Sequence, residues 1–142
     1  MISFKEEVNL QEEQLKELYN NVKWSAYTDD LPRLVSAINH SLKVITAWDE
    51  DKLIGLIRVV GDGQTIVYIQ DILVLENYQN RGIGSELLSR ILALYSDVRQ
   101  KVLLTNDVED VRAFYEKNGF MSCDKGELVA FAKFGNWINI FL

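Results

Sequence analysis

Cysteine, histidine and proline are almost absent from this chain, whose 142 residues include one of each. Because Cys123 stands alone, no disulfide can form within the chain, and a zinc site built from several cysteines is excluded. His40 is the only histidine, so we expect no metal chemistry of the kind that histidine ligands support. The sequence therefore predicts a protein that works without a metal.

Long apolar runs are missing as well. No stretch approaches the roughly 20 residues that a membrane-spanning helix needs. The first residues also lack the basic-then-apolar pattern of a secretory signal. We therefore expect a cytoplasmic protein without a membrane partner.

Positive charge is scarce, since 15 basic residues face 21 acidic ones and the formal net charge is −6. This balance argues against nucleic acid as the main partner, because phosphate backbones are bound through clustered Lys and Arg. It mildly favours a cationic substrate. With 48% hydrophobic and 25% charged residues, the composition is that of an ordinary globular protein, and the length predicts a single domain over residues 1–142.

Hydrophobic periodicity predicts both helices and strands. Three successive β-rich runs are separated by short turn sequences and should form an antiparallel meander. A later buried strand is reached through a helix and should lie parallel to the third strand. We therefore expect an α/β fold of the α+β type, with a mixed, mostly antiparallel sheet flanked by helices and one parallel strand pair. The predicted helices cover residues 11–23, 31–41, 83–95 and 108–117, and the predicted strands cover residues 44–48, 53–60, 65–75, 102–105 and 128–134.

A segment containing two glycines joins the third strand to the helix at residues 83–95. A helix N-terminus leaves backbone N–H groups without intrahelical partners and carries about half a positive charge, so an anion is stabilised there. The glycines remove the Cβ atoms that would hold a phosphate away from the backbone. The segment runs Gln79, Asn80, Arg81, Gly82, Ile83, Gly84, Ser85.

Two familiar glycine loops do not fit this segment. The dinucleotide fingerprint needs a small residue where this chain has Leu87, and the Walker loop needs Gly-Lys-Ser/Thr where this chain has Gly84, Ser85 and Glu86. An ordinary turn with a glycine at the helix entry is the alternative interpretation. The remaining pattern is Gln-x-x-Gly-x-Gly behind a hydrophobic strand.

This pattern resembles the coenzyme A loop of the GNAT superfamily of N-acetyltransferases. The likeness is carried by the strand end Asp71, Ile72, Leu73, Val74 that leads into the loop, and by a second motif at residues 113–120, Ala-Phe-Tyr-Glu-Lys-Asn-Gly-Phe. The order of helices and strands is also that of the family. The second motif departs from the family at Val108, where an asparagine is usual. The N-terminal half looks like the branch that includes arylalkylamine acetyltransferases.

The resemblance implies acetyl-CoA as cosubstrate and roles for particular residues. It implies that the phosphates bind the loop residues given above, that the pantetheine arm binds the backbone of Ile72, Leu73 and Val74, and that Tyr115 protonates the leaving thiolate. The strand residues could equally be core positions, and Tyr115 could be a core aromatic on a helix face. The family's reaction is direct attack by an amine through a tetrahedral intermediate.

The acceptor site and the general base are less clearly marked. Trp24, Tyr27 and Trp48 could form aromatic walls of an amine pocket, although aromatic residues are more often part of a core. Asp71 or Glu76, acting through water, could accept the proton of the amine. His40 is expected at the surface. Asp30 could either attract a cationic substrate or cap a helix.

Two functional hypotheses follow. The first is an acetyl-CoA-dependent N-acetyltransferase acting on a primary amine of a small molecule or a peptide. The alternative is a non-catalytic module that binds an acyl-CoA and acts through a homodimer or another partner. The apolar tail at residues 137–142 either covers the chain's own core or meets a partner subunit.

Overall fold

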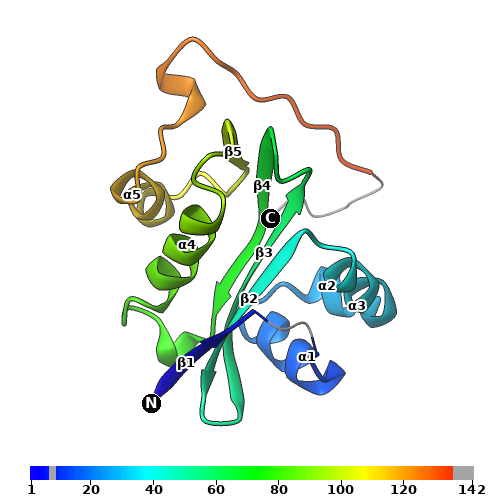
Figure 1. The fold of residues 1–142 in the computed structure, drawn as a ribbon. Helices are drawn as coiled ribbons and strands as arrows, with labels where there is room; N and C mark the ends of the chain where they lie inside the picture. Colours follow the sequence, from blue (N-terminus) through cyan, green and yellow to red (C-terminus); the bar gives the residue numbers. More distant parts are fainter. Residues whose placement is uncertain (7–8, 136–142) are drawn as a thin grey trace. The chain divides into compact units, whose positions relative to one another are not determined.

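The computed structural model describes residues 1–6 and 9–135 (Figure 1). The chain forms two compact units, Met1–Leu103 and Leu104–Leu142. Among the described residues, no helix is both long enough and apolar enough to cross a bilayer.

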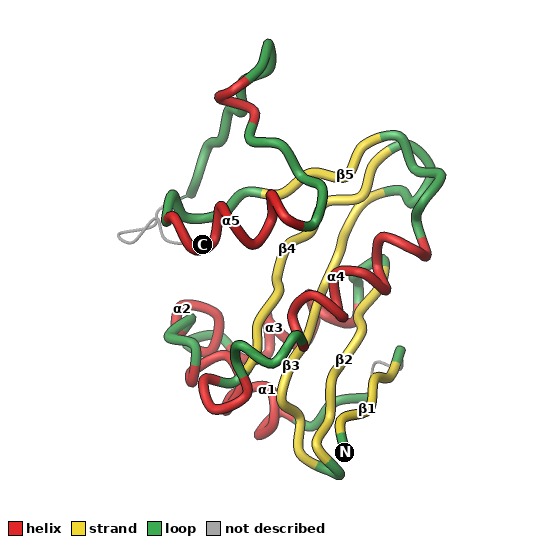
Figure 2. The backbone as a smooth tube through the Cα atoms, turned by 90° about the vertical axis from the view of Figure 1, so that its left-hand side faces the viewer, coloured by secondary structure: helices red, strands yellow, loops and turns green. Residues whose placement is uncertain are grey.

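The first unit is built on one five-stranded sheet whose spatial order follows the chain (Figure 2). The first four strands pair antiparallel, and the fourth and fifth strands pair parallel. The predicted mixed sheet, with its antiparallel meander and its single parallel pair, is therefore confirmed. The strands are β1 (Ile2–Lys5), β2 (Lys43–Asp49), β3 (Lys52–Gly61), β4 (Ile66–Val74) and β5 (Gln100–Leu103).

Helices cover both faces of this sheet. Figure 1 shows α4 (Ile83–Leu94) on one face and α1 (Glu12–Asn21), α2 (Ser25–Thr28) and α3 (Leu31–Asn39) on the other. Because both faces are covered, β3 is buried at seven consecutive residues, whereas β4 alternates between buried and half-buried residues. The helix predicted at residues 83–95 is confirmed as α4, and four of its side chains are at most 5% exposed: Ile83, Leu87, Leu88 and Ile91.

Several boundaries differ from the prediction. The four residues of β1 and the single turn of α2 were not predicted, because such short elements carry no periodicity that can be recognised. The strand predicted at residues 102–105 is β5, two residues earlier, and none of its side chains is buried. It lies at the edge of the sheet, so it lacks the neighbour that would cover its outer side.

The second unit contains α5 (Glu109–Lys117) and a short 3-10 helix, η2 (Cys123–Lys125). The strand predicted at residues 128–134 is wrong, since the structure assigns no strand there and Phe131 is 94% exposed. An apolar run rich in β-formers has the propensity to form a strand, but a strand forms only where the backbone of another strand pairs with it. The apolar tail at residues 137–142 lies outside the described residues.

The turn between β3 and β4 sets how these two central strands pair. The Asp62 carboxylate accepts backbone N–H bonds from Gln64, Thr65 and Ile66 at 2.8 to 3.1 Å, and these bonds lower its pKa. Gly61 has a φ of +135° there, and a Cβ on it would stand 2.4 Å from the carbonyl oxygen of Ile66. The turn therefore requires glycine at position 61.

We predict that Gly61→Ala lowers the free energy of unfolding by about 3 kcal/mol, through backbone strain and overlap with Ile66. Gly63→Ala is the matched control in the same turn: its φ is +71°, but the new methyl would meet only side chains at ordinary distances, Leu42 at 3.4 Å and Tyr95 at 3.7 Å. That variant should lose about 1 kcal/mol. Urea unfolding followed by circular dichroism measures both variants. Equal losses of unfolding free energy would show that overlap with the Ile66 carbonyl is not what makes glycine necessary at position 61.

Candidate active site

The glycine loop is fixed to the end of β4 by side chains. The amide Nε2 of Gln79 donates to the carbonyl oxygen of Val74 at 2.9 Å. Before it, in the 3-10 helix η1 (Glu76–Tyr78), the Tyr78 hydroxyl donates to Asp49 at 2.6 Å, and the Arg81 guanidinium lies 5.0 Å from the centre of the Tyr78 ring. The loop is thus held at both its strand end and its middle.

The backbone of this loop contains two left-handed residues. Asn80 and Gly82 both adopt left-handed conformations, with φ of 63° and 80°, on either side of Arg81. Alternation of this kind turns successive N–H groups toward one point, as in known anion sites. Within the described chain, no side chain caps α4, so its first amides keep their hydrogen-bonding capacity. A Cβ on Gly82 would meet no atom within 4 Å, which leaves open space where an anion such as a pyrophosphate would lie.

Among the described residues, the strand before the loop has a free edge. The parallel ladder between β4 and β5 consists of four pairs and ends at Ile69 and Leu103, although β4 continues to Val74. On its other side, β4 carries one extra residue, Gln70, because Arg58 pairs with Asp71 while Val59 pairs with Ile69. This is a β-bulge at the point where the β5 ladder stops. The backbone of residues 72–74 lies beyond it.

A buried polar cluster lies beside the bulge. Oδ2 of Asp71 accepts a hydrogen bond from the Tyr19 hydroxyl at 2.9 Å and another from Nε of Arg58 at 2.7 Å. The side chains of Arg58 and Asp71 are 6% and 0% exposed. Burial, and then the charge of Asp71, raise the pKa of Tyr19. Oδ1 of Asp71 is also buried and has no partner among the described residues.

Tyr27 extends this cluster toward solvent. Its hydroxyl accepts a hydrogen bond from Nε2 of Gln70 at 3.2 Å, and its ring lies 5.4 Å from that of Tyr19 and 6.0 Å from that of Trp24. Burial, followed by the charge of Asp71, raises the pKa of Tyr27. Both Trp24 and Tyr27 are half-buried, so these aromatic side chains remain accessible.

Of the four residues expected around an acceptor, the structure groups Trp24, Tyr27 and Asp71 and places Trp48 elsewhere. Trp48 lies next to the β2–β3 turn, where its indole donates to Thr46 at 2.7 Å and Lys5 lies over its ring. The sequence patterns did not indicate Tyr19 or Arg58 as members of this site. Arg58 carried a usable signal, because it is a lone charge inside an apolar strand.

The other candidates for a base stand at the surface. His40 is exposed, as predicted, and its Nδ1 lies 2.8 Å from the carbonyl oxygen of Ser36. Glu76 is exposed, and its backbone N–H donates to the Asn21 side chain at 2.8 Å, which joins the end of α1 to the loop. Asp30 caps α3 by accepting from the backbone N–H of Arg33.

Tyr115 lies on α5 in the second unit. Its ring makes edge contacts with Phe114 and Phe120, at 5.0 and 5.8 Å between ring centres. Burial raises the pKa of its hydroxyl to about 12. No described residue forms a hydrogen bond with that hydroxyl. Val108, where the family usually has asparagine, precedes α5 and gives it no side-chain cap.

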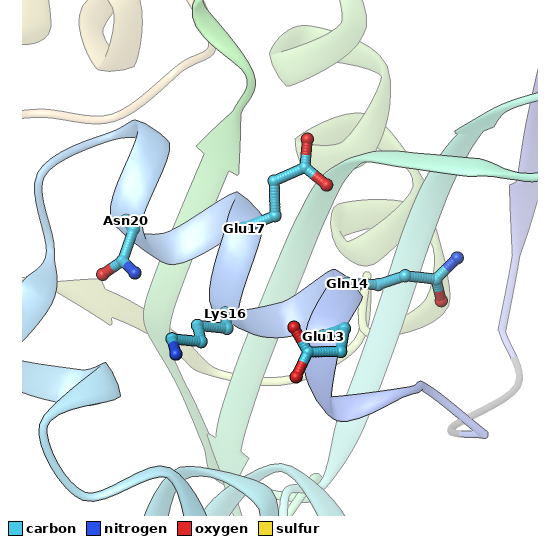
Figure 3. Close-up of a pocket in the computed structure, with 5 residues that line it drawn as sticks. All are labelled: Glu13, Gln14, Lys16, Glu17 and Asn20. Carbon is cyan, nitrogen blue, oxygen red and sulfur yellow. The ribbon is translucent and has the colours of Figure 1, made fainter.

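A separate hollow of about 340 Å³ lies along α1, and all its lining side chains come from that helix (Figure 3). It contains none of the residues discussed above for a cofactor or an acceptor. Its lining residues are Glu13, Gln14, Lys16, Glu17 and Asn20. In the part of the chain that the structure describes, no group of three or more His, Cys, Asp or Glu side chains could hold a metal ion.

Comparisons with known proteins bear directly on these features. The model of the acetyltransferase (GNAT) domain matches residues 40–122, which include the β4 edge, the glycine loop and Tyr115. A relative in Prochlorococcus marinus, named as an uncharacterized ycf52-like N-acetyltransferase, is 32% identical over 123 residues, and the match covers 83% of this chain and 67% of that protein.

Solved structures agree with the family model. A GNAT family acetyltransferase from Streptococcus pneumoniae is 33% identical, with a TM-score of 0.85 over 96% of this chain and 100% of that one. At 15% identity, the structure of AAC(6')-Iy in complex with a bisubstrate analog, CoA-S-monomethyl-acetylneamine, shares the fold, with a TM-score of 0.64 over 95% of this chain and 99% of that one. The family model and the relatives above 30% identity support an acyltransferase, and the chain belongs to the GNAT superfamily of acetyltransferases.

Proposed function

We propose that this protein is an N-acetyltransferase that moves the acetyl group of acetyl-CoA to a primary amine of a small molecule or a peptide. The observation that carries the proposal is the uncapped start of α4, with left-handed Asn80 and Gly82, directly after the free edge of β4. Membership of the family and the coenzyme A analog bound by the AAC(6')-Iy neighbour support the same cosubstrate.

The loop residues would hold the cosubstrate by its phosphates. The backbone amides of residues 82–85 would donate to the pyrophosphate, and the α4 dipole favours the negative charge there. Arg81 adds a guanidinium beside Tyr78. When bound, acetyl-CoA supplies an activated acyl group on a thioester and a thiolate leaving group.

The free edge of β4 would orient the acyl group. Backbone groups of Ile72, Leu73 and Val74 would bind the pantetheine arm, and an N–H there would donate to the thioester oxygen. Direct attack by the amine forms the C–N bond and concentrates negative charge on that oxygen before the C–S bond breaks. A fixed donor at such a position is worth about 3 kcal/mol.

Tyr115 would meet the leaving sulfur as a hydrogen-bond donor. With its pKa at about 12, the phenol is neutral at pH 7 and keeps its proton ready. Full transfer to a thiolate, whose thiol has a pKa of about 8.5, is uphill by about 5 kcal/mol. The phenol of Tyr115 therefore first stabilises the thiolate through a hydrogen bond. The negative charge of the sulfur favours sharing of the phenol proton between the two atoms, and this completes the proton transfer.

A direct test mixes the protein with acetyl-CoA and a panel of polyamines, arylalkylamines, aminoglycosides and peptides, and follows free thiol release. We expect at least one primary amine to give thiol release that saturates with amine concentration, and mass spectrometry to find its acetylated product. Calorimetry with coenzyme A is run in parallel. Binding of coenzyme A without turnover of any amine would instead favour a non-catalytic module, and absence of both would end the proposal.

Gly82→Ala should weaken coenzyme A binding about tenfold or more, because the added methyl occupies the space in front of the α4 amides. Gly63→Ala, with a similar positive φ of +71° against +80°, serves as the control for backbone strain. Calorimetry gives both dissociation constants. Equal effects of the two substitutions would show that strain, rather than the phosphate site, explains the loss.

Tyr115→Phe should lower kcat about 100-fold, since a general acid contributes about 10²- to 10⁴-fold. The ring contacts with Phe114 and Phe120 remain, so the dissociation constant for coenzyme A should change less than about threefold. Tyr95→Phe, a substitution at the end of α4, is the control for loss of a tyrosine hydroxyl. An unchanged kcat in Tyr115→Phe would remove this residue from the mechanism.

A further inference from the structure

The bulge in β4 turns two consecutive side chains toward helices on the same face of the sheet. Neighbouring residues on a regular strand point to opposite faces. Here Gln70 reaches Tyr27 of α2, and Asp71 reaches Tyr19 of α1, because the extra residue at the bulge changes the direction of one side chain. Bulges are frequent next to active sites for this reason. The strand thus presents an amide and a carboxylate side by side.

The Tyr27 hydroxyl has hydrogen-bonding capacity to spare. A phenol can donate one hydrogen bond and accept others. Gln70 uses one acceptor position, which leaves the proton and one further lone pair. Burial and the neighbouring Asp71 charge raise the pKa of Tyr27, so the group is neutral at pH 7 and cannot act as a phenolate base. It can accept a proton only if it passes its own to a neighbour.

Asp71 is the neighbour whose charge, after burial, raises the pKa of Tyr27. Its Oδ2 is held by Tyr19 and Arg58, which fix the carboxylate from α1 and from β3. Its Oδ1 is buried and has no partner in the described part of the chain. Buried carboxylate oxygens are rarely left without a donor, so this one is a place where a proton can arrive. The titratable groups that surround Tyr27 are Asp71, Arg58 and Tyr19.

We propose that Tyr27 is the residue that takes the proton of the acceptor amine and passes its own proton to Oδ1 of Asp71. As the C–N bond forms, nitrogen gains positive charge and its N–H becomes acidic. That proton moves to the Tyr27 oxygen while the phenol proton moves to Asp71. After the product leaves, the same path in reverse returns the proton to water.

The positions of Tyr27 and Asp71 fit this proton relay, which rests on the acetyl transfer proposed above. Gln70 lies at the end of the β5 ladder, two residues before Ile72, where the acyl group is expected. Tyr27 is half-buried, so a substrate can reach it, whereas Asp71 is enclosed. Tyr27 is therefore the catalytic residue on the acceptor side. Asp71 acts through it.

Tyr27→Phe tests the relay, because it removes the hydroxyl and keeps the ring against Trp24 and Tyr19. With acetyl-CoA and the amine of the panel that gives the highest turnover, kcat should fall about 100-fold. The KM for the amine and the dissociation constant for coenzyme A should each change less than about threefold. Tyr95→Phe, which removes a tyrosine hydroxyl at the end of α4 and outside this cluster, is the control and should leave kcat within about threefold.

Asp71→Asn combined with Tyr27→Phe tests whether the two act in series. If they do, the double variant loses no more than about twofold beyond the slower single variant. Should Asp71→Asn fail to fold because it leaves Arg58 unpaired, the comparison of Tyr27→Phe with Tyr95→Phe still decides. A Tyr27→Phe enzyme with normal kcat, with a raised KM alone, or with the same loss as Tyr95→Phe overturns the relay. Wild-type protein that acetylates nothing overturns the acetyl transfer itself.

Discussion

The buried ion pair between Arg58 and Asp71 is the interaction on which the first unit depends. It joins the two central strands at a bulge, and the Tyr19 hydroxyl adds a bond from α1 to the same oxygen of Asp71. Because removing one partner leaves a buried charge without compensation, such pairs hold neighbouring elements in one arrangement even where their net stabilisation is small. The arrangement fixed here places polar groups, rather than apolar ones, beside the free edge of β4.

The sequence was sufficient to predict the elements that depend on local rules. The glycine loop was found because strand, glycines and an amphipathic helix follow one another directly, and the structure gives Asn80 and Gly82 the left-handed backbone that such a loop needs. The meander and the parallel pair followed from the lengths of the connections between strands. His40 also lies at the surface as expected. Asp30, for which the sequence left both cation attraction and a helix cap open, is a helix cap.

Features that depend on partners distant in sequence were not predictable. Tyr19 and Asp71 are 52 positions apart, and nothing in either neighbourhood indicates that they meet. Trp48 and Trp24 looked alike as candidates for an aromatic wall, but only Trp24 contacts Tyr27. Residues 128–134 have the composition of a strand, yet no strand is formed there. In each case the side chain or backbone group is suitable, and tertiary structure alone decides what it contacts.

The attachments of α1 have a consequence for motion. This helix is bonded to the β2–β3 hairpin through Gln14 and Asp51, to β4 through Tyr19, and to the segment before the glycine loop through Asn21. Local opening of α1 must break bonds to both the region expected to hold the nucleotide and the region expected to hold the amine. These regions therefore share one cooperative opening unit, and hydrogen exchange at α1 would slow on occupation of either one.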